Sequence, residues 1–466
     1  MEDNLLKALL NKVDNVLNRG NDIASASKDN YVAWCSPGIP FQEEDLQFAV
    51  KGLKGGDADE TRILVRTAAE FSQLANSIPS SNVIGGTFEQ SGNTVWDIYS
   101  DVLRFSKIPD NDLSEEEKAK VERLRSMLVT TQKVKDIITD EEKEITTDSP
   151  MVVAYTEMMA AYENAVLMYN NKRLSALNSE DSQAVQDFAL NASLYRNQVK
   201  LAMNNWIGKG YKEDFEKIGA YIRHVSQRNM TLLKAELQDR FEKSKMTDPT
   251  SGIDFFFTNF YPANFISSDK GWADFMFKYQ SKETYLKEKN QSTSAETKIK
   301  WGLWKAGADA KHSKNNINNS FESEDFVMKF KITQVPLGRG WFSPDFILNN
   351  SWDWDQSIHK LLSNGVIPPT GRMIAYPTTA VFIKDVEITG SKVKDVFTEV
   401  KQSLDAGGTA GYGPISLSAR HKRDSKDSNT SFNEKTNTLK VKGMQLLAFK
   451  CFALPKTPDC TLENLV

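Results

Sequence analysis

Two segments near the end of the chain match each other without a gap, and this match constrains the fold most. Residues 301–332 and residues 412–443 align at an offset of 111 positions (412 minus 301). In both, an aromatic residue and a glycine precede alternating small residues, a polar Asn/Ser tip and a Lys-x-Lys strand. Alternation with a period of two is typical of a strand with one solvated face. The match therefore predicts two related, superposable β-hairpins in a pseudo-symmetric β domain.

Helical periodicity dominates the first half of the chain. Apolar residues recur at steps of three and four in the first segment, and Gly20 is expected to end that helix. Ser114 and Glu117 have the spacing of a capping box, which predicts a helix running to about residue 136. The same periodicity predicts three long antiparallel helices, at about 150–177, 180–207 and 212–243.

The pattern changes at a polar turn cluster, Thr247–Gly252, which indicates a domain boundary. Beyond it, the apolar run Thr378–Ile383 predicts a central strand, whereas Ser36–Pro40 predicts a loop. The sequence thus predicts an α+β chain of two domains. They are an antiparallel α-helical bundle (1–246), a connecting segment (247–297) and an antiparallel, β-sandwich-like domain with the duplicated hairpin (298–466).

Composition narrows the class of protein. Hydrophobic residues at 40% and charged residues at 26% are typical of a globular protein with ample core material. A net charge of −4 argues against nucleic acid as the main partner. The three cysteines, Cys35, Cys451 and Cys460, are few and odd in number, which indicates unpaired thiols, although Cys451 and Cys460 could meet across a turn. The acidic N-terminal segment is not a secretory signal, so we expect cytoplasmic synthesis, with release or export by a leaderless route.

No motif specifies a reaction. The four histidines are scattered, and none has a second His or Cys at metal-ligand spacing. Asp355 and His359 lie four residues apart and make half a metal site, but a helix-surface ion pair explains them as well. The glycine-rich segment 407–413 lacks the Lys-Ser/Thr ending of a phosphate loop. The sequence therefore predicts no catalytic residue, no cofactor and no metal. An enzyme site around Trp352, Asp355 and His359 is the alternative.

Tryptophans supply the first candidate contact with a membrane or ligand. Trp341, Trp352 and Trp354 lie in a dense aromatic stretch, and Trp304 lies in the first matching segment. A flat apolar ring with one polar edge suits a sugar or a membrane interface. The alternative is a packed plug over the end of the β domain, since tryptophan is highly buried on average.

A methionine-rich helix supplies the second candidate contact. Met158 and Met159 belong to the segment Met151–Tyr169, whose charges are Glu157 and Glu163 alone. Such a helix could enter a bilayer if the carboxylates were protonated or paired. The alternative is a helix buried on all sides.

These features favour a non-enzymatic bacterial protein that binds a membrane or cell surface, pore-forming or toxin-like, and that oligomerises. Matching hairpins with one apolar and one polar face suit insertion into a transmembrane barrel, but they suit a plain β-sandwich equally. The predicted partners are a membrane lipid or cell-surface ligand and further copies of the chain. The alternative function is a structural or assembly protein whose β domain makes the subunit contacts.

Overall fold

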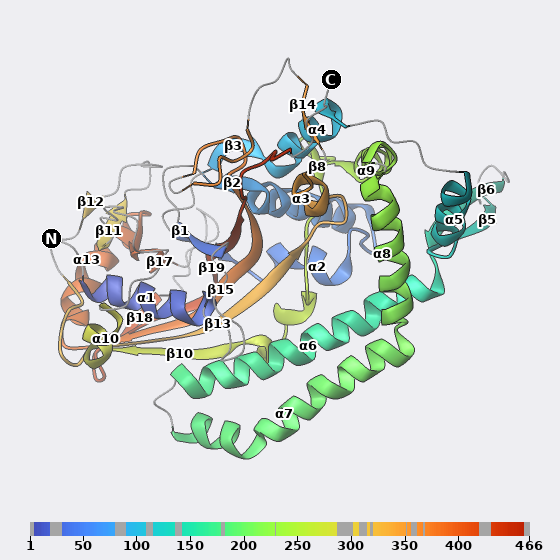
Figure 1. Ribbon diagram of the computed structural model, residues 1–466. Coiled ribbons are helices and arrows are strands. Elements are labelled where there is room, and N and C mark those ends of the chain that lie inside the picture. Colours follow the sequence, from blue (N-terminus) through green and yellow to red (C-terminus); the bar gives the residue numbers. More distant parts are fainter. Residues whose placement is uncertain are drawn as a thin grey trace.

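The computed structural model is a mixed α/β fold built around one long antiparallel sheet (Figure 1). The structure describes residues 4–18, 30–79, 90–108, 115–135, 142–178, 182–228, 230–286, 302–306, 315–316, 320–350, 352–355, 361–366, 369–418 and 430–460.

The large sheet has the strand order β1-β19-β15-β13-β10, with β18 beside β19 and β9 beside β13. All of these neighbours are antiparallel. Its strands are β1 (Asn30–Phe41), β9 (Asn259–Phe260), β10 (Ala273–Lys278), β13 (Val327–Gly338), β15 (Ala375–Thr389), β18 (Thr430–Asn433) and β19 (Thr438–Ala453).

The remaining strands form a second, smaller sheet and four two-stranded ribbons. The smaller sheet has the order β12-β11-β16-β17 and contains β11 (Leu303–Ala306), β12 (Asn315–Asn316), β16 (Thr409–Tyr412) and β17 (Ile415–Ser416). The ribbons pair β2 (Ser77–Pro79) with β3 (Gln90–Thr94), β4 (Ser106–Lys107) with β14 (Asp353–Trp354), β5 (Val129–Lys135) with β6 (Glu142–Asp148), and β7 (Lys245–Thr247) with β8 (Asp254–Phe256).

Most helices gather at one end of the large sheet and along its β10 edge (Figure 1). The longer ones are α1 (Asn4–Asn18), α3 (Ala58–Ala75), α4 (Val95–Phe105), α5 (Glu115–Ser126), α6 (Pro150–Asn178), α7 (Ser182–Lys209), α8 (Lys212–Arg228), α9 (Met230–Lys243) and α13 (Val393–Asp405). The short ones are η1 (Glu44–Leu46), α2 (Phe48–Lys51), η2 (Ala263–Phe265), η3 (Asp269–Gly271), η4 (Tyr279–Ser281), α10 (Lys282–Leu286) and α12 (Pro344–Ile347). Of these helices, α1, α10 and α13 lie at the other end of the large sheet, near the smaller sheet (Figure 1).

The central position of β15 follows from its composition. The side chains of Val381, Phe382 and Ile383 are fully buried although successive strand residues point to opposite faces of a sheet. Apolar material therefore covers both faces of β15, as expected for a strand in the middle of a sheet that is packed on both sides. β15 pairs with β13 on one side and β19 on the other, so the predicted central strand at Thr378–Ile383 is confirmed.

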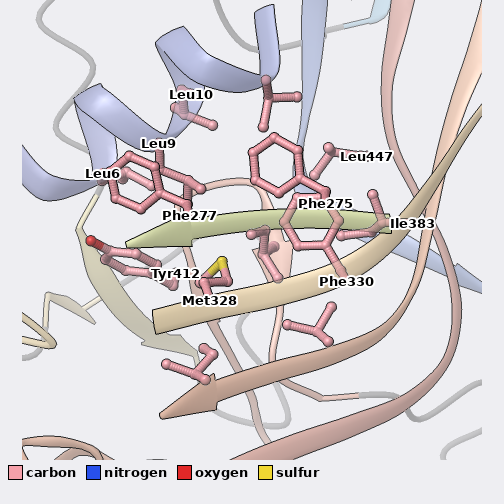
Figure 2. Packing of buried hydrophobic residues seen from close by; sticks show 14 of the residues in the cluster. Leu6, Leu9, Leu10, Phe275, Phe277, Met328, Phe330, Ile383, Tyr412 and Leu447 are labelled. Carbon is pink, nitrogen blue, oxygen red and sulfur yellow. The ribbon is translucent and has the colours of Figure 1, made fainter. Parts of the chain in front are cut away.

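Helix α1 is embedded in the main core. Its leucines face Phe275 and Phe277 of β10, and Leu6, Leu9 and Leu10 belong to the same buried cluster as Tyr412 (Figure 2). Its polar groups are bonded to the body as well, since Lys12 Nζ donates to the Met276 carbonyl oxygen at 2.6 Å. Such a bond lowers the cost of burying a polar group.

The structure does not confirm the predicted pair of hairpins. In the first matching segment β11 belongs to the smaller sheet and β13 to the large sheet, and in the second segment β17 and β19 are divided in the same way. Matching positions nevertheless pair with the same residues of β15, since Val327 and Thr438 both lie opposite Thr389. Much of each polar tip (307–314, 317–319 and 419–429) lies outside the described residues.

The bundle-plus-sandwich arrangement is not confirmed either. Strand β1 comes from the 1–246 segment but pairs with β19, and β9 and β10 of the 247–297 segment also join the large sheet. The predicted loop at 36–40 was wrong, because those residues lie within β1, where the register with β19 shifts. Strands from three parts of the chain thus share one sheet. The long helices predicted at 150–177 and 180–207 are present as α6 and α7, whereas the single helix predicted at 212–243 was wrong, because that stretch forms two helices, α8 and α9.

Candidate interaction surface on the helical arm

Conventional catalytic chemistry finds little support in the described part of the chain. There, no group of three or more His, Cys, Asp or Glu side chains could hold a metal ion. His359 lies outside the described residues, so the Asp355–His359 pair is untested. Burial raises the pKa of the Cys35 and Cys451 thiols well above their usual range. Both are therefore held as thiols, which are poor nucleophiles.

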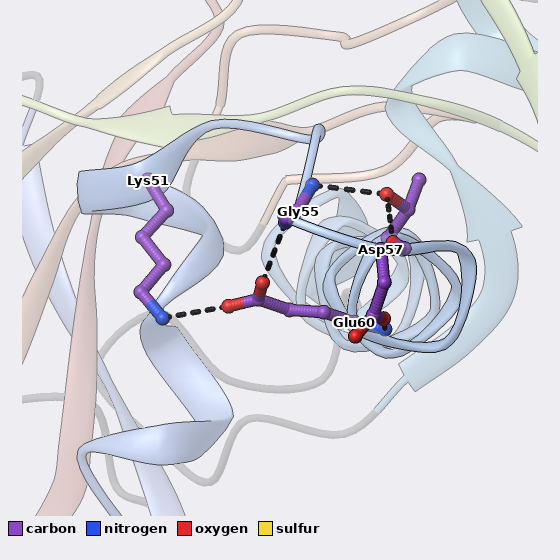
Figure 3. Close-up of polar contacts among 6 residues, drawn as sticks. Lys51, Gly55, Asp57 and Glu60 are labelled. Atoms are coloured by element: carbon purple, nitrogen blue, oxygen red, sulfur yellow. Dashed lines mark hydrogen bonds and ion pairs between the residues drawn. The ribbon is translucent and has the colours of Figure 1, made fainter.

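A glycine-rich turn before α3 resembles an anion site at first sight but is filled by its own chain (Figure 3). The Gly56 amide donates to Glu60 Oε2 at 2.7 Å, and the Glu60 amide donates to Asp57 Oδ1 at 2.8 Å. Lys51 Nζ donates to Glu60 Oε1 at 2.8 Å, and this bond lowers the pKa of the Glu60 carboxyl. The amides that would cradle a phosphate are occupied, so the turn is a capped helix start.

The four predicted contact tryptophans are buried. Trp341, Trp352 and Trp354 belong to a core cluster at the helical end of the sheet, and Trp304 lies in the smaller sheet. Their exposed fractions are 2%, 0%, 6% and 4%, in that order. The indole N–H groups of Trp341, Trp352 and Trp304 donate to backbone carbonyls of Phe257, Ile347 and Gly413. In this conformation the four rings are packed inside the protein.

The predicted methionines lie on α6, which pairs with α7 to form a helical arm. We use "arm" for residues 150–209, of which 179–181 lie outside the described residues. Met158 and Met159 are half-buried on α6. Figure 1 shows α6 beneath β10, with α7 on its far side, away from the sheet. The arm therefore presents the outer side of α7 to the surroundings.

A ladder of aromatic rings holds the arm together. Tyr155, Tyr162 and Tyr169 recur every seven residues on α6, so they lie on one face of the helix. Tyr155 and Tyr162 place their ring centroids 5.3 Å and 5.5 Å from the Trp206 ring of α7, and Tyr169 lies 6.0 Å from Phe188. Aromatic pairs at such distances stabilise a contact beyond the area that they bury.

The arm is attached to the body without sharing an apolar core. Among the described residues, no side chain of α6 or α7 belongs to any of the four hydrophobic clusters of the protein. Asn171 Nδ2 donates to the carbonyl oxygen of Gly271 at 2.8 Å, beside the β10 edge of the sheet. The Tyr155 ring of the arm stacks on Phe215 of α8 with 3.9 Å between the ring centroids. The arm thus packs beside the large sheet and is joined to α8 through an aromatic contact.

The outer side of α7 carries three exposed leucines. Leu190, Leu194 and Leu201 are 80%, 54% and 62% exposed. At about 100° per residue they fall within roughly 40° of one another, on the side of the helix opposite Ala192 and Trp206, which are buried against α6. We call these three residues the leucine face. Single exposed apolar residues are ordinary, but an aligned set marks an interaction site.

The charges of α7 are few and unevenly placed. The helix has four residues with charged side chains, of which Arg196, Lys200 and Lys209 are exposed. The fourth, Asp187, is half-buried at the junction with α6, where Lys172 Nζ donates to Asp187 Oδ2 at 3.0 Å. That bond lowers the pKa of the Asp187 carboxyl and holds it in the charged form. The three exposed charges of α7 are therefore all positive, whereas the Asp187 carboxylate, 35% exposed, is paired with Lys172.

Neither a protein-family model, nor a curated protein, nor a solved structure matches this chain. Within the described residues, no helix is both long enough and apolar enough to cross a membrane. The leucine face was not among the sites predicted from the sequence. Its signal was present in the spacing of four and seven between the leucines and in the low charge of residues 182–209. The leucine face was not predicted because a longer apolar stripe of the same segment, which faces α6, dominates the periodicity.

Proposed function

We propose that this protein is non-enzymatic and binds the surface of a lipid bilayer through the leucine face of α7. The observation that carries the proposal is the exposure of Leu190, Leu194 and Leu201 on one side of a helix whose described side chains belong to none of the four hydrophobic clusters. A helix with an apolar face and basic flanks lies in a membrane interface with that face among the acyl chains.

The strength of binding follows from the exposed area. The exposed surface of the leucine face amounts to roughly two complete leucine side chains. Transferring it to acyl chains gains roughly 3–6 kcal/mol. A single myristoyl chain binds in that range, reversibly. One copy should therefore bind weakly, and several joined copies should bind far more tightly because their contacts add on one surface.

The stronger form of the proposal is a pore-forming, toxin-like protein that oligomerises on the membrane. The described side chains of α6 and α7 belong to none of the four hydrophobic clusters, so movement of the arm away from the sheet would leave those clusters intact. This supports a change of conformation on the bilayer. Leakage of an entrapped dye from vesicles tests this form. Binding without leakage from any lipid mixture would restrict the function to surface attachment.

Vesicle co-sedimentation tests the proposal itself. The variant Leu190→Gln/Leu194→Gln/Leu201→Gln removes the apolar face while keeping good helix formers. It should lose on the order of 100-fold in vesicle affinity, which corresponds to the lower end of the transfer energy. The matched control is Val50→Gln/Ile63→Gln/Ile253→Gln, since these residues are 55%, 50% and 65% exposed elsewhere on the body. The control should bind like the unaltered protein.

The second candidate function is a structural or assembly role. The exposed leucine face would support this role if another copy of the chain covered it. Light scattering after size-exclusion chromatography separates the two. A dimer that dissociates in the leucine variant, with no vesicle binding by either protein, would replace the membrane proposal. Equal vesicle affinity of the leucine variant and the unaltered protein would also overturn it.

A further inference from the structure

We infer that the surface recognised by α7 is an anionic lipid surface, an inference that rests on the proposed function and names its ligand class. It depends on a different observation from the leucine face. Every exposed ionisable side chain of α7 is a cation: Arg196, Lys200 and Lys209. None of them has a carboxylate partner among the ion pairs of the described residues. The Arg196 guanidinium donates instead to the Ala192 carbonyl of its own helix at 3.3 Å.

The positions of these cations fit a helix lying flat in the headgroup region. Measured around the helix axis at about 100° per residue, Lys200 lies roughly 100° to one side of the leucine face and Lys209 roughly 80° to the other. Arg196 lies further round, on the side of Lys200. Lysine and arginine extend long apolar stems along a surface and place the charge at its polar boundary. Leucines at the centre and cations on both flanks therefore match acyl chains beneath anionic headgroups.

The same charges disfavour a second copy of the chain as the occupant. Packing α7 against the α7 of another copy would bring two entirely positive flanks together, and no exposed carboxylate of that helix would compensate. The only carboxylate of α7, on Asp187, is already bonded to Lys172, Asn191 and Tyr195 within the arm. Charge complementarity thus favours an anionic surface outside the protein.

The contribution of the three cations to vesicle affinity can be calculated before the experiment. Each cation beside an anionic membrane surface strengthens binding roughly 5-fold, so three should give on the order of 100-fold. This part of the affinity should weaken as salt is added, because screening acts on exposed charges. The contribution of the leucines should not weaken, since salt does not reduce apolar burial.

Two variants and two kinds of vesicle test the inference. The vesicles are phosphatidylcholine alone and phosphatidylcholine mixed with phosphatidylglycerol. The cation variant is Arg196→Gln/Lys200→Gln/Lys209→Gln. The control, Lys54→Gln/Lys329→Gln/Lys442→Gln, removes the same net charge from exposed sites elsewhere. The unaltered protein and the control should bind the mixed vesicles on the order of 100-fold more tightly than the neutral ones at low salt. The cation variant should lose that preference and keep its affinity for neutral vesicles.

The outcomes separate the inference from the function on which it rests. Leucine-dependent binding with equal affinity for both vesicles, or an anionic preference that survives in the cation variant, overturns the anionic inference and leaves the membrane function standing. No binding to either vesicle overturns the membrane function, and light scattering then reports whether a second copy covers α7. Binding of an acidic protein with no vesicle binding would count against both.

Discussion

Trp206 offers the sharpest test of whether the arm is an independent packing unit. Its ring is 8% exposed and lies between Tyr155 and Tyr162 of α6, with Lys212 Nζ 4.8 Å from the ring centroid. Removing a large buried aromatic side chain costs roughly 3–5 kcal/mol, because the backbone cannot close the cavity that it leaves. Trp206→Ala should therefore remove most of the free energy that joins α6 to α7.

Native-state hydrogen exchange is the appropriate assay because it reports opening segment by segment. In Trp206→Ala, amides of α6 and α7 should lose protection, while amides of β13, β15 and β19 should not. Trp341→Ala is the matched control, since Trp341 belongs to a core cluster that joins the helical end to the body. That substitution should lower protection in the body.

Trp206→Phe refines the prediction. The indole N–H of Trp206 is buried without a hydrogen-bond partner in the described structure, and such a group costs about 1–3 kcal/mol. Phenylalanine keeps an aromatic ring for Tyr155 and Tyr162 and removes that group, so Trp206→Phe should destabilise the arm less than Trp206→Ala. A loss below about 1 kcal/mol in Trp206→Ala, or equal loss of protection in arm and body, would refute the reasoning.

Three further predictions concern stability and pH. Gly210→Ala should lower the melting temperature of the arm in a thermal scan, because the added Cβ would lie 2.8 Å from Met158 Cβ and 2.8 Å from the Trp206 carbonyl oxygen. Burial raises the pKa of Glu163 above its ordinary value of 4.5, so the native arm binds more protons than the unfolded arm. The stability of the arm, followed by hydrogen exchange, should therefore rise as pH falls from neutral towards that value, and Glu163→Gln should flatten the dependence. Leu9→Ala should cost about 2–5 kcal/mol in urea unfolding, since Leu9 is fully buried in the main core, and an effect below about 1 kcal/mol would show that α1 can detach.

The long helices were predictable because their signal is local. Apolar spacing alone gives α6 and α7 to within a few residues of their observed bounds. The helix predicted to continue to residue 136 was wrong beyond Ser126, because the chain turns into the β5–β6 ribbon. In the register of that ribbon Lys133 is paired with Glu144. Cross-strand pairs stabilise a ribbon, but they follow the register of two strands, which the spacing of apolar residues along one segment does not reveal.

Partners of strands were not predictable for a related reason. Alternation in the matching segments indicates strands and a solvated face, but it does not indicate which strand lies alongside. The structure places β15 between β13 and β19, so the strands of the matching segments pair with a third strand. Likewise, Trp341 and Trp352 have the composition of a ligand surface, and only the tertiary fold shows that they are packed inside.

Neither helix formation nor packing explains why the three residues of the leucine face are apolar. Leu190, Leu194 and Leu201 point away from α6, so they add nothing to the aromatic ladder that holds the arm. Lysine, glutamate and glutamine have helix propensities close to that of leucine, so polar residues would form α7 equally well. Polar residues would also lower the risk of aggregation. Because neither helix formation nor packing requires apolar side chains here, the proposed membrane contact accounts for their alignment, and the positive charges beside them are complementary to an anionic surface.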